Sequence, residues 1–344
     1  MNKIGFKKYE FKVETLTPLH IGCGEKIVPM EYFIENGYLH VCNFEKFLDI
    51  LFSREIATNE ILNNITNLPK RSNFLDLLKR FDLENERYKF VLYKIPVEEN
   101  FSVEFHPFIR HSNNQLFIPG SSIKGAIRTA LISKDESKMD GVRRIIMGRN
   151  DGKKKKDKEL SKTLEFEFKD PRNLMVRDIE IELKGGIMRI KRLGMGKNPR
   201  LTAHEFINIS TRDNVKLEIF SREDICEFIP IINEFYLNSL NSILNMNVIR
   251  KNKEVQLNLE RIRNEISNNK DNSNVVYLQV GFGGNYFTKS LGYQLIKWTN
   301  DKDLVEIRKK LKFGFKGFPR RPFPKTFTVV DKYDTQPGWI KLSR

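Results

Sequence analysis

The sequence predicts an α+β fold, because strand-like and helix-like segments are mixed along the chain and several strands are joined by hairpins. Residues 8–16 (KYEFKVETL) alternate apolar and polar side chains, as a strand with one buried face does. Two further strand-like runs flank Asn36-Gly37, a dipeptide typical of a tight hairpin turn. Residues 121–132 carry apolar side chains at helical spacing, which indicates a helix packed on a sheet.

The order of elements in the first half (strand, helix, strand pair, helix, strand) fits a ferredoxin-like, or RRM-like, unit. The expected strands are 8–16, 31–35, 38–42, 88–95, 101–109 and 115–118. The expected helices are 44–56, which Asn43 can cap, 58–67, 72–81 and 121–132. The second half can repeat this plan, although no sequence repeat proves it.

The charged stretch 149–158 (RNDGKKKKDK) is typical of a surface insertion and marks the expected boundary between two domains, 1–160 and 161–344. Strands of the second domain are expected at 163–168, 174–183, 204–210, 215–220, 275–282, 326–330 and 339–343. A helical insertion is expected within 222–266, and two more helices at 289–299 and 302–311. The fold prediction is therefore two tandem ferredoxin-like domains with helical and loop insertions.

The composition is strongly basic. Among 344 residues, 60 Lys and Arg face 44 Asp and Glu, which leaves a net charge of +16. Such a balance indicates a polyanionic partner, with a merely basic surface as the alternative. The scattered cysteines (Cys23, Cys42 and Cys226) form no CxxC pair, so a zinc ribbon is not expected. Free thiols and the lack of a leader or a long apolar run predict a cytoplasmic protein without membrane contact.

The strongest local motif is PGSSIKGAIR at residues 119–128. A helix that starts at this turn offers free backbone N–H groups, and Ser121 or Ser122 can cap it. Lys124 and Arg128 are spaced i and i+4 on one face of that helix. Together with Gly120 these residues predict a phosphate cradle, and an ordinary capped helix with solvated cations is the open alternative.

A glycine loop with the sequence TPLHIGCG follows the first strand. Gly22 and Gly24 indicate a backbone that turns tightly or approaches a ligand, and a plain connection is the alternative.

Two basic segments without any acid support nucleic-acid binding. Residues 184–200 hold six basic residues and four glycines, and Arg189, Arg192 and Lys197 are the candidate contacts. Residues 308–325 place eight basic residues, Arg320 and Arg321 among them, between phenylalanines. The phenylalanines in this second segment are equally compatible with stacking on bases and with docking onto the core or a partner protein.

Signals for catalysis and cofactors are weak. Gly281–Gly284 misses GxGxxG, no HExxH or GxSxG motif is present, and no cofactor or metal is expected. His20 and His111 flank the motifs above and are the candidate general bases if the chain cleaves RNA. A histidine that simply packs in the structure is the more common situation.

LTPLHIGCGE near the start and IPGSSIKGAIRTAL about 100 residues later together resemble the RAMP proteins of type III CRISPR effector complexes. The later GFGGNYFTKSLGYQ, PKTFTVVDKY and GWIKL make the chain similar to the fifth Csm subunit of the type III-A complex. This resemblance implies two tandem ferredoxin-like halves, CRISPR RNA as ligand and neighbouring Csm backbone subunits as partners.

The resemblance further implies a subunit at the guide's 3′-end side that supports guide maturation and recruits a separate host nuclease. By motif match, Gly120, Ser121, Ser122, Lys124 and Arg128 would touch guide phosphates, with Gly22–Gly24 beside them. The related backbone subunit cuts target RNA with an aspartate after its glycine loop, whereas residues 25–35 here contain no Asp.

The expected function is therefore a non-catalytic RNA-binding subunit in antiviral defence. The alternatives are an endoribonuclease that trims CRISPR RNA, a subunit of a type III-B complex, and a protein–protein adaptor that docks through residues 308–325.

Overall fold

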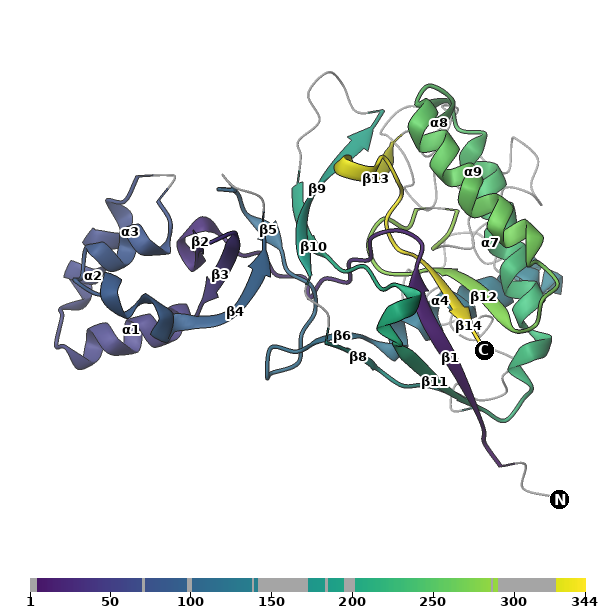
Figure 1. The fold of residues 1–344 in the computed structure, drawn as a ribbon, viewed down its shortest axis with the longest axis horizontal. Helices are drawn as coiled ribbons and strands as arrows, with labels where there is room; N and C mark the ends of the chain where they lie inside the picture. The colour runs from purple at the N-terminus through teal and green to yellow at the C-terminus, as the bar shows by residue number, and fades with distance from the viewer. Residues whose placement is uncertain are drawn as a thin grey trace.

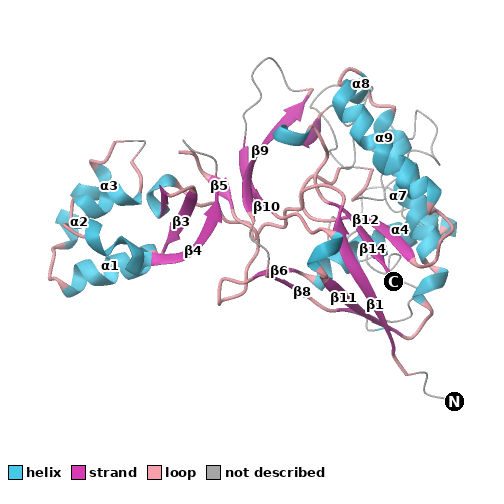
Figure 2. Cartoon of the chain, viewed as in Figure 1, coloured by secondary structure: helices cyan, strands magenta, loops and turns pink. Residues whose placement is uncertain are grey.

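The computed structural model describes residues 5–69, 72–97, 101–137, 139–141, 173–182, 185–194, 202–285, 287–289 and 326–344. Helices and strands are mixed along the chain (Figure 2), which confirms the predicted α+β class. The strands are β1 (Lys7–Thr15), β2 (Tyr32–Glu35), β3 (Tyr38–Cys42), β4 (Val91–Pro96), β5 (Phe105–His106), β6 (Leu116–Ile118), β7 (Leu174–Val176), β8 (Ile179–Ile181), β9 (Gly186–Leu193), β10 (Thr202–Phe206), β11 (Lys216–Ser221), β12 (Val275–Gln279), β13 (Phe327–Val330) and β14 (Trp339–Ser343). The α-helices are α1 (Phe44–Ser53), α2 (Thr58–Thr66), α3 (Phe74–Lys79), α4 (Gly120–Lys134), α7 (Ile229–Leu244), α8 (Asn247–Arg250) and α9 (Lys253–Asn268).

The largest sheet is antiparallel and five-stranded, in the order β12-β14-β1-β11-β7. Tyr9, Phe11 and Val13 alternate along β1 and are buried, which confirms the pattern seen in the sequence. Because β1 pairs with β14, the first and last described strands lie side by side within this sheet (Figure 1).

The strands β14-β1-β11-β7 have the antiparallel order of a ferredoxin-like sheet, and β12 adds a strand at the edge. These strands come from both halves of the chain, so the first half does not build a ferredoxin-like unit of its own. The expected tandem pair of such units is not confirmed, and the expected domain boundary at 160/161 lies outside the described residues. The other strands of the first half, β2 to β6, instead join smaller sheets, β2-β3-β4, β6-β8 and β13-β9-β10-β5.

Helices α4, α7 and α9 pack together on the large sheet and enclose the main hydrophobic core. The buried side chain of Asn233 ties α7 to β12, because its amide donates to the Val275 carbonyl at 2.8 Å and accepts from the Tyr277 N–H at 3.0 Å. Among the described helices, none combines the length and the apolar character needed to cross a bilayer.

Strands β2–β4 and helices α1–α3 form a separate lobe with a hydrophobic core of its own, at the left of Figure 1. The predicted hairpin turn is confirmed by positive φ angles of 53° at Asn36 and 75° at Gly37. The predicted cap is confirmed too, since the Asn43 side chain accepts from the Lys46 N–H at 2.9 Å.

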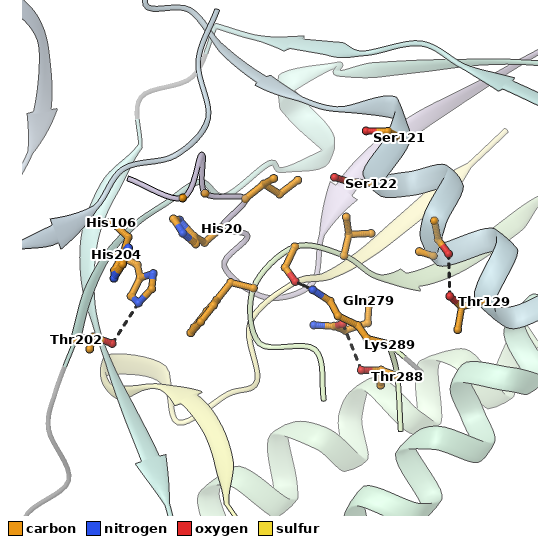
Figure 3. A pocket seen from close by; sticks show the side chains of 18 of the residues that line it. His20, His106, Ser121, Ser122, Thr129, Thr202, His204, Gln279, Thr288 and Lys289 are labelled. Atoms are coloured by element: carbon orange, nitrogen blue, oxygen red, sulfur yellow. Dashed lines mark hydrogen bonds between the residues drawn. The ribbon is translucent and has the colours of Figure 1, made fainter. Parts of the chain in front are cut away.

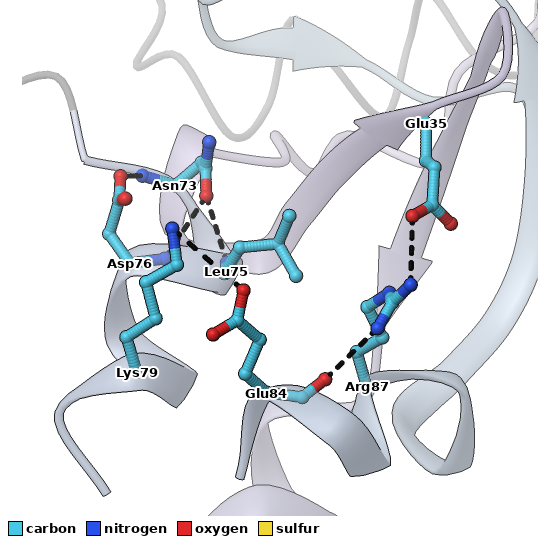
Figure 4. A network of polar contacts seen from close by, with 7 residues as sticks. All are labelled: Glu35, Asn73, Leu75, Asp76, Lys79, Glu84 and Arg87. Carbon is cyan, nitrogen blue, oxygen red and sulfur yellow. Dashed lines mark hydrogen bonds and ion pairs between the residues drawn. The ribbon is translucent and has the colours of Figure 1, made fainter. Parts of the chain in front are cut away.

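Polar contacts also hold the start of α3 and the turn before β4 in this lobe (Figure 4). Asn73 caps α3 by accepting from the N–H groups of Leu75 and Asp76. Arg87, in the 3-10 turn η2 (Glu84–Phe90), pairs with Glu35 of β2 at 2.9 Å. This ion pair connects η2, which directly precedes β4, to strand β2 of the same sheet.

Several predicted elements differ in extent. The strand expected at 101–109 is reduced to β5, because Pro107 has no N–H to continue a ladder. The strand expected at 174–183 is divided into β7 and β8 by a turn at Arg177 and Asp178. The strand expected at 163–168 and the helices expected at 289–299 and 302–311 lie outside the described residues.

Candidate nucleic-acid interface

A cavity of about 810 Å³ opens between α4, the glycine loop after β1, and the loop after β12 (Figure 3). Its described lining residues are His20, Ile21, Gly22, Gly24, His106, Ser121, Ser122, Gly125, Ala126, Thr129, Arg192, Thr202, His204, Gln279, Val280, Gly281, Phe282, Thr288 and Lys289. None of these described lining residues is Asp or Glu, whereas Arg192 and Lys289 are cationic. A cavity with this lining favours an anionic ligand.

The α4 wall of the cavity carries hydroxyl groups and a glycine. Ser121, Ser122, Gly125 and Thr129 line the cavity from one side of the helix, opposite the histidines in Figure 3. A side chain added at Gly125 would meet no atom within 4 Å, so a ligand backbone can come close there.

The start of α4 is not capped as the sequence predicted, and its role as a phosphate cradle stays a prediction. Pro119 occupies the N-cap position, and neither serine caps the helix. Gly120 is buried, and its N–H donates to the Asp178 carboxylate at 2.7 Å. A Cβ at Gly120 would lie 2.1 Å from the Val176 carbonyl oxygen, so this glycine permits close packing against β7, and RNA contact at Gly120 stays a prediction.

The two cations of the predicted cradle also lie away from the cavity lining. The Lys124 ammonium donates to the Leu174 carbonyl at 2.6 Å and thereby ties α4 to β7. Arg128 is exposed, and it too is absent from the described lining. Lys124 therefore makes a contact within the fold, and contact of Lys124 or Arg128 with a phosphate stays a prediction.

The glycine loop lies on the same cavity as α4, as the motif match predicted. Gly22 and Gly24 both line it, and Gly24 has a φ of +93° that favours glycine. The loop is held by the Phe282 N–H, which donates to the His20 carbonyl at 2.7 Å. RNA contact by these two glycines stays a prediction.

Three histidines meet at the opposite wall. The ring centroids of His20 and His204 are 4.7 Å apart, and those of His106 and His204 are 4.6 Å apart. Burial lowers the pKa of His20 to about 4, although its Nδ1–H donates to the Glu205 carbonyl at 2.6 Å. Burial likewise lowers the pKa of His204 to about 3. Both imidazoles are therefore neutral near pH 7.

The sequence identified only one of these histidines. His111, the second predicted base, stacks on Phe117 at 3.9 Å and is not part of the cavity lining. His106 and His204 are about 100 residues apart in the sequence, and only the parallel pairing of β5 with β10 brings them opposite each other. For that reason they were not recognised as site residues. Nothing in the local sequence signals that pairing.

The predicted basic segments are only partly described. Arg192 lines the cavity, whereas Arg189, three residues earlier on β9, lines a separate cavity of about 510 Å³. Lys197, Arg320 and Arg321 lie outside the described residues, so the predictions for them remain predictions.

A buried ion pair supports the histidine wall. The Arg110 guanidinium bonds both oxygens of Glu205, at 2.7 and 2.5 Å, and Glu205 is fully buried. Within the described ranges, no group of three or more His, Cys, Asp or Glu side chains is arranged to hold a metal ion.

A sequence model of the RAMP superfamily matches residues 12–318. The chain belongs to the RAMP superfamily. This RAMP protein is 30% identical to the "CRISPR system Cms protein Csm5" of Methanocaldococcus jannaschii, over 97% of this chain and 88% of that relative. It is 27% identical to the Csm5 of Streptococcus thermophilus over 38% of this chain and 40% of that relative.

Two solved structures share the fold of this chain. A chain of a "Csm-crRNA-target RNA ternary complex in type III-A CRISPR-Cas system" superposes with a TM-score of 0.68 at 20% identity, and the match covers 97% of this chain and 100% of that chain. The crystal structure of T.onnurineus Csm5 gives a TM-score of 0.50 at 17% identity, covering 96% and 99% of the two chains.

Proposed function

We propose that this RAMP protein is a non-catalytic subunit of a type III-A Csm effector complex that binds the CRISPR RNA at the 3′-end side of the guide. The acid-free cavity between α4 and the glycine loop carries the proposal. The Csm5 relatives and the fold shared with a chain of a Csm–crRNA complex support it. Neighbouring Csm subunits are the proposed protein partners, and recruitment of a host nuclease for guide maturation belongs to the same proposal.

The cavity suits a phosphodiester backbone for physical reasons. Arg192 offers positive charge, and the hydroxyl groups of Ser121 and Ser122 on α4 are able to donate, whereas the Lys289 ammonium already donates to the Gly281 carbonyl. Contacts of this kind recognise phosphate and ribose without reading the base. Binding should therefore tolerate different guide sequences and weaken with added salt.

Replacing Arg192 with Ala should weaken binding of a single-stranded guide RNA by about tenfold, the usual effect of losing one charge-assisted hydrogen bond. The slope of log affinity against log salt should also become shallower by about 0.7, because one phosphate contact is lost. Fluorescence anisotropy at several salt concentrations measures both quantities.

Arg189→Ala is the matched control, since Arg189 is also exposed and lies on the same strand but lines the other cavity. It removes the same charge from the protein and should leave the slope nearly unchanged. Equal effects of the two variants would contradict the cavity as the binding site and leave only general electrostatic attraction.

The proposal that the protein is not an enzyme rests on the histidines. Acid–base catalysis works best when the pKa of the catalytic group lies near the working pH. The pKa values of about 4 for His20 and 3 for His204 lie far below 7, so neither supplies an imidazolium as a general acid. The cavity nevertheless holds three histidines together with Arg192 and Lys289. An endoribonuclease is therefore the second candidate for the function.

Incubation of the purified chain with guide precursor separates the two candidates. We expect the RNA to stay intact over hours at pH 7. Cleavage by the wild-type chain that disappears in the His20→Ala variant would establish the endoribonuclease instead.

A further inference from the structure

The histidine wall contains a continuous stack of three aromatic rings. His106 lies on His204 at 4.6 Å with an interplanar angle of 21°, and His204 lies on Phe282 at 4.4 Å with an angle of 26°. His20 meets both His204 and Phe282 edge-on, at 82° and 80°. The three stacked rings are therefore held in place by contacts with one another and by the edge-on contacts of His20.

The stack is accessible at its ends. His204 in the middle is 5% exposed, whereas His106 and Phe282 are only half-buried, and all three line the cavity. Phe282 packs partly on the small core formed by Ile190, Phe206 and Val330, and the rest of its surface borders the cavity.

The backbone holds Phe282 at the cavity in advance of any ligand. Its N–H donates to the His20 carbonyl, and the preceding Gly281 has a φ of +67°. A Cβ at Gly281 would lie 2.2 Å from the His20 carbonyl oxygen, so glycine is required for this approach. Such preorganisation lowers the entropic cost of binding.

The chemistry of the wall suits a flat, uncharged ring. His204 is neutral near pH 7, so it does not repel the cations that line the same cavity. An unpaired base gains stacking energy on an aromatic face, and every base offers such a face.

The amide in the cavity does not read the edge of a base. The Gln279 Nε2 donates to the Pro337 carbonyl at 2.9 Å, and its Oε1 accepts from the Thr288 hydroxyl at 3.3 Å. Because both ends of this amide are engaged, stacking on the wall should not depend on base identity.

We propose that the half-buried ring of Phe282, at the end of the His106–His204–Phe282 stack, receives one unpaired nucleobase of the bound RNA on the part that borders the cavity. Arg192, which lines the same cavity, then meets an adjoining phosphate. The inference rests on the proposed function and extends it, because it adds a base-stacking site to a surface otherwise expected to contact only the backbone.

The test uses the full-length chain and a set of guide RNAs, each carrying 2-aminopurine at a single position. Stacking on an aromatic ring quenches this base, so one position should lose most of its fluorescence on binding. An abasic residue at that position should weaken binding by roughly tenfold, as expected for one lost stacked base.

Variants then locate the site. Phe282→Leu should abolish the quenching at that position, and Phe282→Trp, which keeps an aromatic ring, should retain it. Phe117→Leu is the matched control, because Phe117 is also half-buried and stacked on a histidine but is not part of the cavity lining. It should change neither the quenching nor the affinity.

The outcomes separate this inference from the proposed function. RNA that binds tightly with no position quenched, and with no effect of abasic residues, would overturn the stacking site and leave the RNA-binding role intact. A wild-type chain that binds no guide RNA would overturn both. Quenching that persists in Phe282→Leu would also overturn the assignment to this ring.

Discussion

Replacing Glu205 with Gln should lower the free energy of unfolding by about 3–5 kcal/mol, the usual cost of leaving one partner of a buried ion pair without the other. The Glu205 side chain is 0% exposed and that of Arg110 is 10% exposed, so water cannot take over the lost interaction. Urea unfolding at pH 7 measures the difference.

Glu218→Gln is the control for this experiment. Glu218 also pairs with an arginine, Arg177 at 2.7 Å, and with Lys8, but the Arg177 side chain is 67% and the Glu218 side chain 24% exposed, so solvent screens the charges. That variant should unfold almost as the wild type does. A double variant, Glu205→Gln with Arg110→Met, should recover much of the lost stability, because no buried charge then remains unpaired.

If Glu205→Gln were as stable as Glu218→Gln, the buried pair would contribute nothing to the fold. The histidine wall would be affected as well, because the backbone carbonyl of Glu205 orients His20.

Local structure was predictable where a few neighbouring residues determine it. The Asn36-Gly37 turn, the Asn43 cap and the alternation along β1 all depend on contacts within a short stretch of chain. The arrangement of strands in the large sheet was not predictable in the same way, because β1 pairs with residues more than 200 positions away.

Helix α4 shows the same difference between what the local sequence determines and what distant segments determine. The spacing of Lys124 and Arg128 correctly placed them on a common side of α4, but spacing does not say what that side faces. The Lys124 ammonium donates a hydrogen bond to the Leu174 carbonyl of β7. The side of α4 that carries Ser121, Gly125 and Thr129 faces the cavity instead. Only the neighbouring elements decide which side meets a ligand.

Acidification from pH 6.5 to pH 5 should destabilise the protein steeply. The pKa of His20 falls from 6.5 to about 4 on folding, and that of His204 falls from 6.5 to about 3. Between these values the unfolded chain binds protons that the folded chain does not, so lower pH favours unfolding. Each histidine should contribute about 1.4 kcal/mol per pH unit in this window, and His40, whose pKa burial also lowers, should add to the slope.

The variant His204→Phe isolates the contribution of one ring. Phe can keep the packing between His106 and Phe282 but has no proton to bind, so the slope should decrease by about 1.4 kcal/mol per pH unit. Urea unfolding at pH 6.5, 6.0, 5.5 and 5.0 gives the slope for both chains. An unchanged slope in His204→Phe would mean that this imidazole becomes protonated without unfolding the protein. In that event the ring wall would carry positive charge in mild acid, and the neutral stack proposed for the nucleobase would hold only above that pH.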